Sequence, residues 1–157
     1  MSLHVIFGLL LALWTPPAGD YSGQATIPRK IPKDLMITYQ RPDGWMCQDY
    51  KLTVTADGAV VFKKCLGVAM NGSIPQKLIK RLIAEFDRAK FFSLQEDYSE
   101  GPRSCLIDGS SAIISIRING KSKTVMRNQV CKAPKPPKAL TELGNKIGEI
   151  VVRSGGF

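Results

Sequence analysis

The segment Cys47–Cys65, CQDYKLTVTADGAVVFKKC, constrains the fold more than any other part of the chain because it predicts a complete β-hairpin. Leu52 and Val54 alternate with polar residues, which is the pattern of a half-buried strand. Asp57-Gly58 is a turn signal, and apolar residues alternate again after it. This pattern indicates fold and cellular compartment rather than activity.

The register of this hairpin depends on the length of its loop. A two-residue loop would leave the apolar residues of the two strands out of phase. A three-residue loop, with Gly58 left-handed in a bulge, sets Leu52 opposite Phe62. It also sets Val54 opposite Val60, so that the apolar residues of both strands share one face. We therefore predict the three-residue loop.

The cysteines predict an oxidising compartment. The chain has four of them: Cys47, Cys65, Cys105 and Cys131. An even number in an exported chain predicts two disulfide bonds, for which three pairings are open. We favour Cys47–Cys65, diagonal neighbours on the first hairpin, and Cys105–Cys131, which bracket a second one; separate buried thiols are the alternative. No Cys-x-x-Cys motif occurs, so neither a thioredoxin-type site nor a zinc ribbon is indicated.

The chain resembles a secreted bacterial domain of unknown function, family 6438, from about Leu35 to Val152. The motifs that carry the resemblance are Cys47-x-x-Tyr50, Asp57-Gly58, Phe91-Phe92-Ser93-Leu94, Tyr98, the Ile118-Asn119-Gly120-Lys121 turn and the helix after Pro136-Pro137. Family members usually have proline after the first cysteine of the hairpin, where this chain has Gln48. The resemblance implies no activity, cofactor or catalytic residue.

The N-terminus predicts export. Val5–Trp14 is a run of ten apolar residues followed by prolines and small residues, so we predict a signal peptide over residues 1–19. The run is too short to span a bilayer as a helix, and an uncleaved anchor or a mispredicted start is the alternative. Cleavage near Ala18 or Gly19 would place the protein in the periplasm or outside the cell, with no transmembrane segment left.

Residues 20–33 are predicted to form a basic linker. Its cations, Arg29, Lys30 and Lys33, could contact an anionic surface, but we favour a solvated leader. A single domain over residues 34–153 and a flexible tail over 154–157 follow.

Periodicity predicts the remaining elements of this domain. They are a strand over Asp34–Gln40, a helix over Ser73–Lys90, a hairpin over Ala112–Arg127 with an Asn119-Gly120 turn, and a helix over Ala139–Val152. The second hairpin sets Ile114 opposite Val125. The apolar stripe of the second helix is Leu140, Leu143, Ile147, Ile150 and Val151. Ser73 is the expected N-cap of the first helix, with Gln76 completing a capping box. Gly144 and Gly148 weaken the second helix unless they let it lie close to the sheet.

The order strand, hairpin, helix, hairpin, helix predicts an α+β domain. We expect about five antiparallel strands, stapled by disulfides, with both helices packed on one face. The other face would remain open and carry many serine, threonine, lysine and arginine side chains, and we predict this open, basic face to be the interaction surface.

Composition favours binding over catalysis. The net charge of +9 favours anionic partners, although it can also serve solubility alone. The only histidine, His4, lies in the predicted signal peptide, which excludes histidine-dependent triads and imidazole metal sites from the mature chain. No phosphate-binding loop, dinucleotide fingerprint or nucleic-acid motif occurs, and we predict no cofactor or metal.

Two groups of residues are candidate sites. Lys121, Lys123, Arg127 and Trp45 form the candidate interaction surface; the cations could instead guard a sheet edge, and the tryptophan could cover the core. The second group is an acidic patch that could serve glycoside hydrolysis or hold a cation, although we favour ordinary loop acids. Its members are Glu96, Asp97, Glu100 and Asp108.

We therefore expect an exported, non-catalytic module that binds a protein, such as a secreted enzyme that it inhibits, or an anionic polymer. A carboxylate-dependent hydrolase is the alternative.

Overall fold

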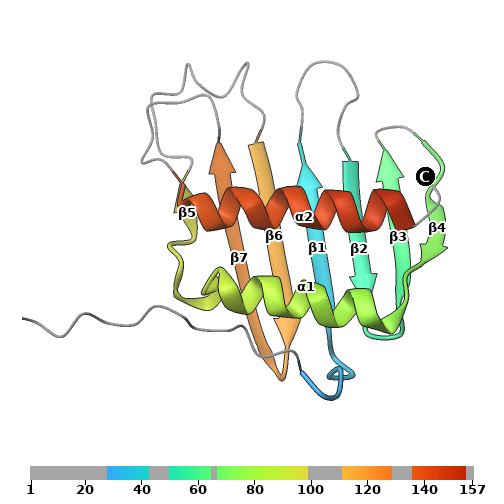
Figure 1. Cartoon of the computed structure of the whole chain (residues 1–157). Helices are drawn as coiled ribbons and strands as arrows, with labels where there is room; N and C mark the ends of the chain where they lie inside the picture. The colour runs from blue at the N-terminus through green and yellow to red at the C-terminus, as the bar shows by residue number, and fades with distance from the viewer. Residues whose placement is uncertain (1–27, 43–49, 65–66, 99–110, 129–135, 155–157) are drawn as a thin grey trace, which may run out of the picture.

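The computed structural model describes residues 28–42, 50–64, 67–98, 111–128 and 136–154. Its strands are β1 (Met36–Arg41), β2 (Tyr50–Thr55), β3 (Ala59–Lys64), β4 (Met70–Ser73), β5 (Asp97–Tyr98), β6 (Ser111–Ile118) and β7 (Lys121–Asn128). Its helices are α1 (Gln76–Arg88), the short 3₁₀ helix η1 (Phe91–Ser93) and α2 (Lys138–Ser154). Both long helices lie side by side across one face of the sheet (Figure 1), which confirms the predicted α+β architecture.

The sheet is larger than predicted. Within the described residues it has seven strands in the order β4-β3-β2-β1-β6-β7-β5. All neighbours are antiparallel except β5 and β7, which are parallel, so the sheet is mixed rather than antiparallel. The two additional strands, β4 and β5, are short edge strands of four and two residues. Neither is long enough to produce an alternating pattern, which is why the expected number of about five was wrong.

Both predicted hairpin registers are confirmed. Leu52 pairs with Phe62 and Val54 with Val60, and Gly58 has a φ of 93° at the end of the three-residue loop. In the second hairpin the type I′ turn has the positive φ values that its conformation requires, 52° at Asn119 and 71° at Gly120. In both cases the turn residues and the apolar alternation favour the same pairing.

The predicted cap of the first helix was wrong. Ser73 belongs to β4, where it pairs with Ala59, and the helix begins at Gln76 with Pro75 as a cap residue that makes no side-chain hydrogen bond. Gln76 instead donates a hydrogen bond from Nε2 to the carbonyl of Ala56, at 3.1 Å. Pairing the strand with β3 satisfies several backbone groups at once, whereas a capping box would satisfy two.

The core lies between the helices and the face of the sheet that they cover. Its most deeply buried side chains are Ile37, Leu52, Val54, Val60, Ile114, Ile116 and Val125 from the sheet, and Ile79, Leu82, Phe91, Leu140, Leu143 and Ile147 from the helices. Gly144 lets α2 approach the sheet, because a Cβ there would lie 3.3 Å from the Arg127 guanidinium and 3.6 Å from Ile114. Gly148 has open space around it, so only the first of the two glycines serves close packing.

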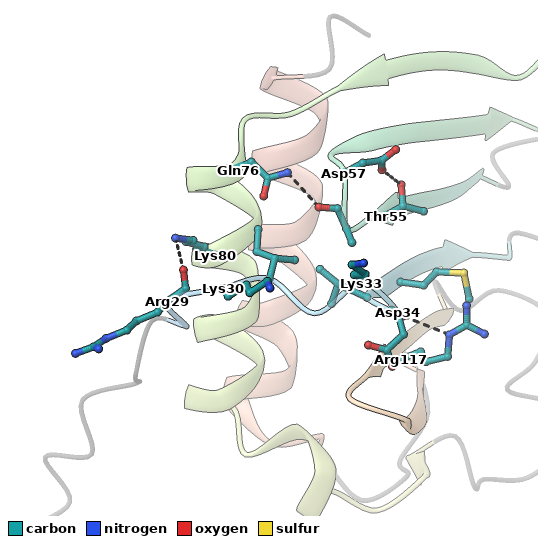
Figure 2. Close-up of a pocket in the computed structure, with 13 residues that line it drawn as sticks. Arg29, Lys30, Lys33, Asp34, Thr55, Asp57, Gln76, Lys80 and Arg117 are labelled. Atoms are coloured by element: carbon teal, nitrogen blue, oxygen red, sulfur yellow. Dashed lines mark hydrogen bonds between the residues drawn. The ribbon is translucent and has the colours of Figure 1, made fainter.

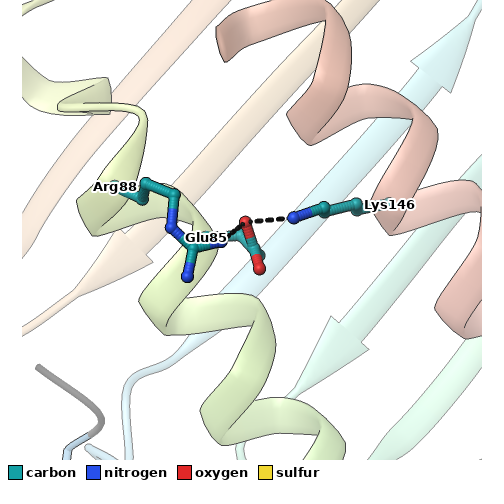
Figure 3. A network of polar contacts seen from close by, with 3 residues as sticks. All are labelled: Glu85, Arg88 and Lys146. Carbon is teal, nitrogen blue, oxygen red and sulfur yellow. Dashed lines mark hydrogen bonds and ion pairs between the residues drawn. The ribbon is translucent and has the colours of Figure 1, made fainter. Parts of the chain in front are cut away.

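One ionic cluster joins the two helices (Figure 3). Glu85 of α1 accepts hydrogen bonds from Arg88 at 2.6 Å and from Lys146 of α2 at 2.8 Å. Burial by itself would raise the pKa of Glu85, but the hydrogen bonds from Lys146 and Arg88 outweigh it and lower that pKa. The carboxylate therefore stays ionised and ties the helices together.

Candidate functional site

The three cations of the predicted interaction surface are on the helix-covered side of the sheet. The register sets Lys121 opposite Ile118, Lys123 opposite Ile116 and Arg127 opposite Ala112. All three cations are therefore on the same face of the sheet as the residues of β6 that face the core. Their environments differ: Lys121 is exposed, Lys123 pairs with Glu96 at 3.5 Å, and Arg127 is only 3% exposed.

The uncovered face of β7 therefore carries Ser122, Thr124 and Met126, and these three lysine and arginine residues do not form a basic surface on it. The sequence contained the signal for this. A register that pairs Ile114 with Val125 already places Lys123 and Arg127 in phase with the apolar residues.

The other predicted site residues are only partly visible. Trp45, all four cysteines, Glu100 and Asp108 lie outside the described residues. Glu96 has a side chain that is 79% exposed and pairs with Lys123, and Asp97 follows it in the edge strand β5. Within the described part of the chain, no group of three or more histidine, cysteine, aspartate or glutamate side chains could hold a metal ion.

A basic cleft that the sequence did not predict lies at one end of the sheet, with a volume of about 900 Å³ (Figure 2). It is bounded by the segment 29–36, the β2–β3 turn, the start of α1 and the end of β6. Its charged lining residues are Arg29, Lys30, Lys33, Lys80 and Arg117, against Asp34 and Asp57. We call these seven residues the basic cleft.

Hydrogen bonds from distant elements fix the walls of the basic cleft. Lys80 of α1 donates from Nζ to the carbonyl of Arg29, at 2.9 Å. Arg117 at the end of β6 donates from Nε to the carbonyl of Asp34, at 3.4 Å. The last residues of the predicted linker are thus held against the domain, which brings their cations beside those of the helix and the sheet.

Both carboxylates of the basic cleft are occupied by local hydrogen bonds. Asp34 accepts from the backbone N–H of Gly120 at 2.7 Å and of Asn119 at 3.0 Å, and these bonds, that of Gly120 foremost, lower its pKa. Asp57 accepts from Thr55 Oγ1 at 2.6 Å and from the N–H of Ala59, and both bonds lower its pKa. Each carboxylate stabilises a hairpin turn.

Four of the five cations of the basic cleft are exposed to solvent. Arg29, Lys30, Lys33 and Arg117 are exposed, and within the described part of the chain none of them forms an ion pair. Five cations against two carboxylates give the lining an excess of three positive charges. Such an arrangement attracts an anion and offers it several charge-assisted hydrogen bonds.

The role of Asp34 predicts a specific pH dependence. Because its pKa is lower in the folded chain than the ordinary 3.8, its contribution to stability is present above pH 3.8 and is lost as the pH falls through the folded-state pKa. Asp34→Asn should therefore be less stable than the parent at neutral pH, and the difference should shrink on acidification. Urea unfolding between neutral pH and about pH 2 measures both curves. A difference that stays constant over that range would contradict this role.

Comparison with known protein families decides the relationship. A family model described as a domain of unknown function, DUF6438, matches residues 46–151, more than half of the chain. The chain belongs to the DUF6438 family. No curated protein matches it significantly. The matched part of the DUF6438 domain includes Lys80 and Arg117 of the basic cleft, whereas Arg29, Lys30 and Lys33 precede it.

None of the helices in the described part of this DUF6438 chain has the length and apolar character needed to cross a membrane.

Proposed function

We propose that this protein is an exported, non-catalytic module that binds an anionic polymer through the basic cleft. The observation that carries the proposal is the convergence of five cations on one cleft whose two carboxylates are already occupied by hairpin turns. A polymer with repeated carboxylate or phosphate groups can contact several of these cations at once. The net charge of +9 adds long-range attraction to the same class of partner.

The chemistry of the cleft favours binding over turnover. Arg29, Lys30 and Lys33 supply hydrogen-bond donors and positive charge but no general base. The carboxylate-dependent hydrolase has less support, because Glu96 is largely exposed and pairs with Lys123 rather than lying in a pocket with a second carboxylate. Binding of an anion therefore needs only the hydrogen-bond donors and positive charge that these cleft residues already supply.

The proposed location rests on the sequence. The apolar run Val5–Trp14, followed by small residues, favours export to the periplasm or beyond. The four cysteines, which we propose to pair as Cys47–Cys65 and Cys105–Cys131, suit an oxidising compartment. Acidic polysaccharides and phosphate-containing polymers of the cell envelope are partners of the required charge.

The test compares two charge-reversed variants of the full chain with the same change in net charge. Lys30→Glu/Lys33→Glu alters the basic cleft. The control, Lys51→Glu/Lys63→Glu, alters two exposed lysines that pair directly with each other on β2 and β3, on the uncovered face of the sheet. Affinity for polygalacturonate and for polyphosphate is measured at low and moderate salt, and circular dichroism checks that each variant folds. All four positions are exposed, so we expect folding to be kept.

We expect the cleft variant to bind at least about tenfold more weakly and the control variant to change less than about threefold. Equal losses in both variants would mean that net charge alone attracts the polymer and would refute the cleft as the site. Unchanged binding in the cleft variant would refute it as well. Capture of a protein that survives high salt, with no polymer bound, would favour the inhibitor alternative over an anionic polymer.

A further inference from the structure

A second hollow, on the helix side of the sheet, has a different chemical character. It lies between the segment 28–32, the end of α1, η1 and the β6–β7 turn, and its volume is about 660 Å³, within the range of small-molecule sites. Its larger apolar lining side chains are Ile83, Phe86, Phe91, Phe92, Ile116 and Ile118, beside Pro28 and Pro32. We call this hollow the apolar groove.

Phe92 is the exposed part of that lining. Lys90, which follows the C-cap residue Ala89 of α1, adopts a left-handed conformation with a φ of 48°, and the chain then enters η1. As a result Phe91 is buried, at 1% exposure, while the neighbouring Phe92 remains 43% exposed. The two rings are perpendicular, with centroids 6.5 Å apart. A large aromatic side chain at the mouth of an apolar hollow offers a contact surface for a hydrophobic ligand.

Cations surround the apolar groove. Lys30, Lys90 and Lys121 line it, and Asp87 is the single carboxylate among its described lining residues. Lys30 and Lys121 are exposed, and neither forms an ion pair with any residue that the structure describes. An apolar floor with a cationic rim is complementary to a molecule that has an alkyl chain and an anionic head group.

We propose that the apolar groove binds a single-chain fatty acid, with the alkyl chain against Phe92 and Ile118 and the carboxylate near Lys121. The ligand's chain would leave water for the apolar floor, which is the main source of affinity for such ligands. Its carboxylate would gain charge-assisted hydrogen bonds from the lysine. This site shares only Lys30 with the basic cleft, and it does not depend on the proposed polymer binding.

The test titrates the full chain with a dansylated undecanoate, whose fluorescence rises when its alkyl chain and dye leave water. Phe92→Glu places a charge in the apolar groove, and Val61→Glu is its matched control, because Val61 is 40% exposed and lies on β3 on the uncovered face. We expect Phe92→Glu to weaken binding at least about tenfold and Val61→Glu to leave it within about twofold.

A second pair of variants tests the contact with the carboxylate head group: Lys121→Glu, with Lys63→Glu as its control. We expect Lys121→Glu to weaken binding of the probe about three- to tenfold. We also expect decanoate to displace the probe far better than decanol does. No saturable binding, equal losses in Phe92→Glu and Val61→Glu, or equal displacement by the alcohol would overturn the proposal. So would a dimer that Phe92→Glu converts to monomers in light scattering, because a second copy would then cover the groove. Binding to anionic vesicles without any affinity for monomeric decanoate would assign the site to a membrane surface and refute a free fatty acid.

Discussion

Replacing Phe91 by alanine is expected to lower the free energy of unfolding by about 3–5 kcal/mol. Its side chain is 1% exposed and lies within the core, where its ring meets that of Phe86 edge to face with centroids 4.9 Å apart. The substitution removes apolar contacts that the surrounding helices and sheet cannot fully replace, and it also removes the aromatic pair. Urea denaturation at neutral pH measures the change.

The adjacent Phe92 is the matched control for this prediction. It has the same side chain one residue along the chain, but 43% of it is exposed. Phe92→Ala should therefore cost less than about 1 kcal/mol, because a half-exposed side chain leaves no closed cavity. Similar losses for both variants would contradict the burial of Phe91 in the core.

Replacing Gly58 by alanine is expected to lower the free energy of unfolding by about 2–4 kcal/mol, which is the second large effect. A Cβ at Gly58 would lie 2.5 Å from the carbonyl oxygen of Ile74, which is backbone and cannot rotate away. The φ of 93° adds strain of roughly 1–2 kcal/mol for any residue with a Cβ, and relief of the clash must move the segment between β4 and α1. That movement also endangers the 2.9 Å hydrogen bond from the Ile74 N–H to the Gly58 carbonyl.

Gly120 provides the control, because it shares the positive φ without the crowding. Its φ is 71°, and a Cβ there would meet no atom within 4 Å. Gly120→Ala should therefore lower the free energy of unfolding only by the strain of a positive φ, roughly 1–2 kcal/mol. Thermal and urea unfolding of the two variants separate clash from strain. If Gly120→Ala proved as costly as Gly58→Ala, the close approach to Ile74 would not be what requires glycine.

The close contact between Gly58 and Ile74 also links the stability of the fold to the proposed binding. Ala56 and Asp57, which precede Gly58 in the β2–β3 turn, line the basic cleft, and Gln76 of α1 holds the carbonyl of Ala56. A displaced turn would move one wall of the cleft relative to Lys80. Stability of the hairpin and geometry of the cleft therefore depend on one tightly packed junction.

Local signals in the sequence determined a large part of the fold. The Asp57-Gly58 and Asn119-Gly120 turns and the apolar alternation beside them predicted both hairpins with their registers, because neighbouring residues along the chain decide such pairings. The apolar stripe of α2 predicted its buried face, at Leu140, Leu143 and Ile147.

Only the tertiary structure decided the edges of the sheet and the sites. Met70–Ser73 became β4 because β3 offered an unpaired edge, and that pairing displaced the expected cap. The basic cleft joins Arg29, Lys80 and Arg117, which are far apart in the sequence and none of which forms a motif with its neighbours. A sequence pattern records which face a residue takes within its own element. Which elements then lie against each other depends on backbone pairing and close packing between distant segments, and those interactions brought the cations of the basic cleft together.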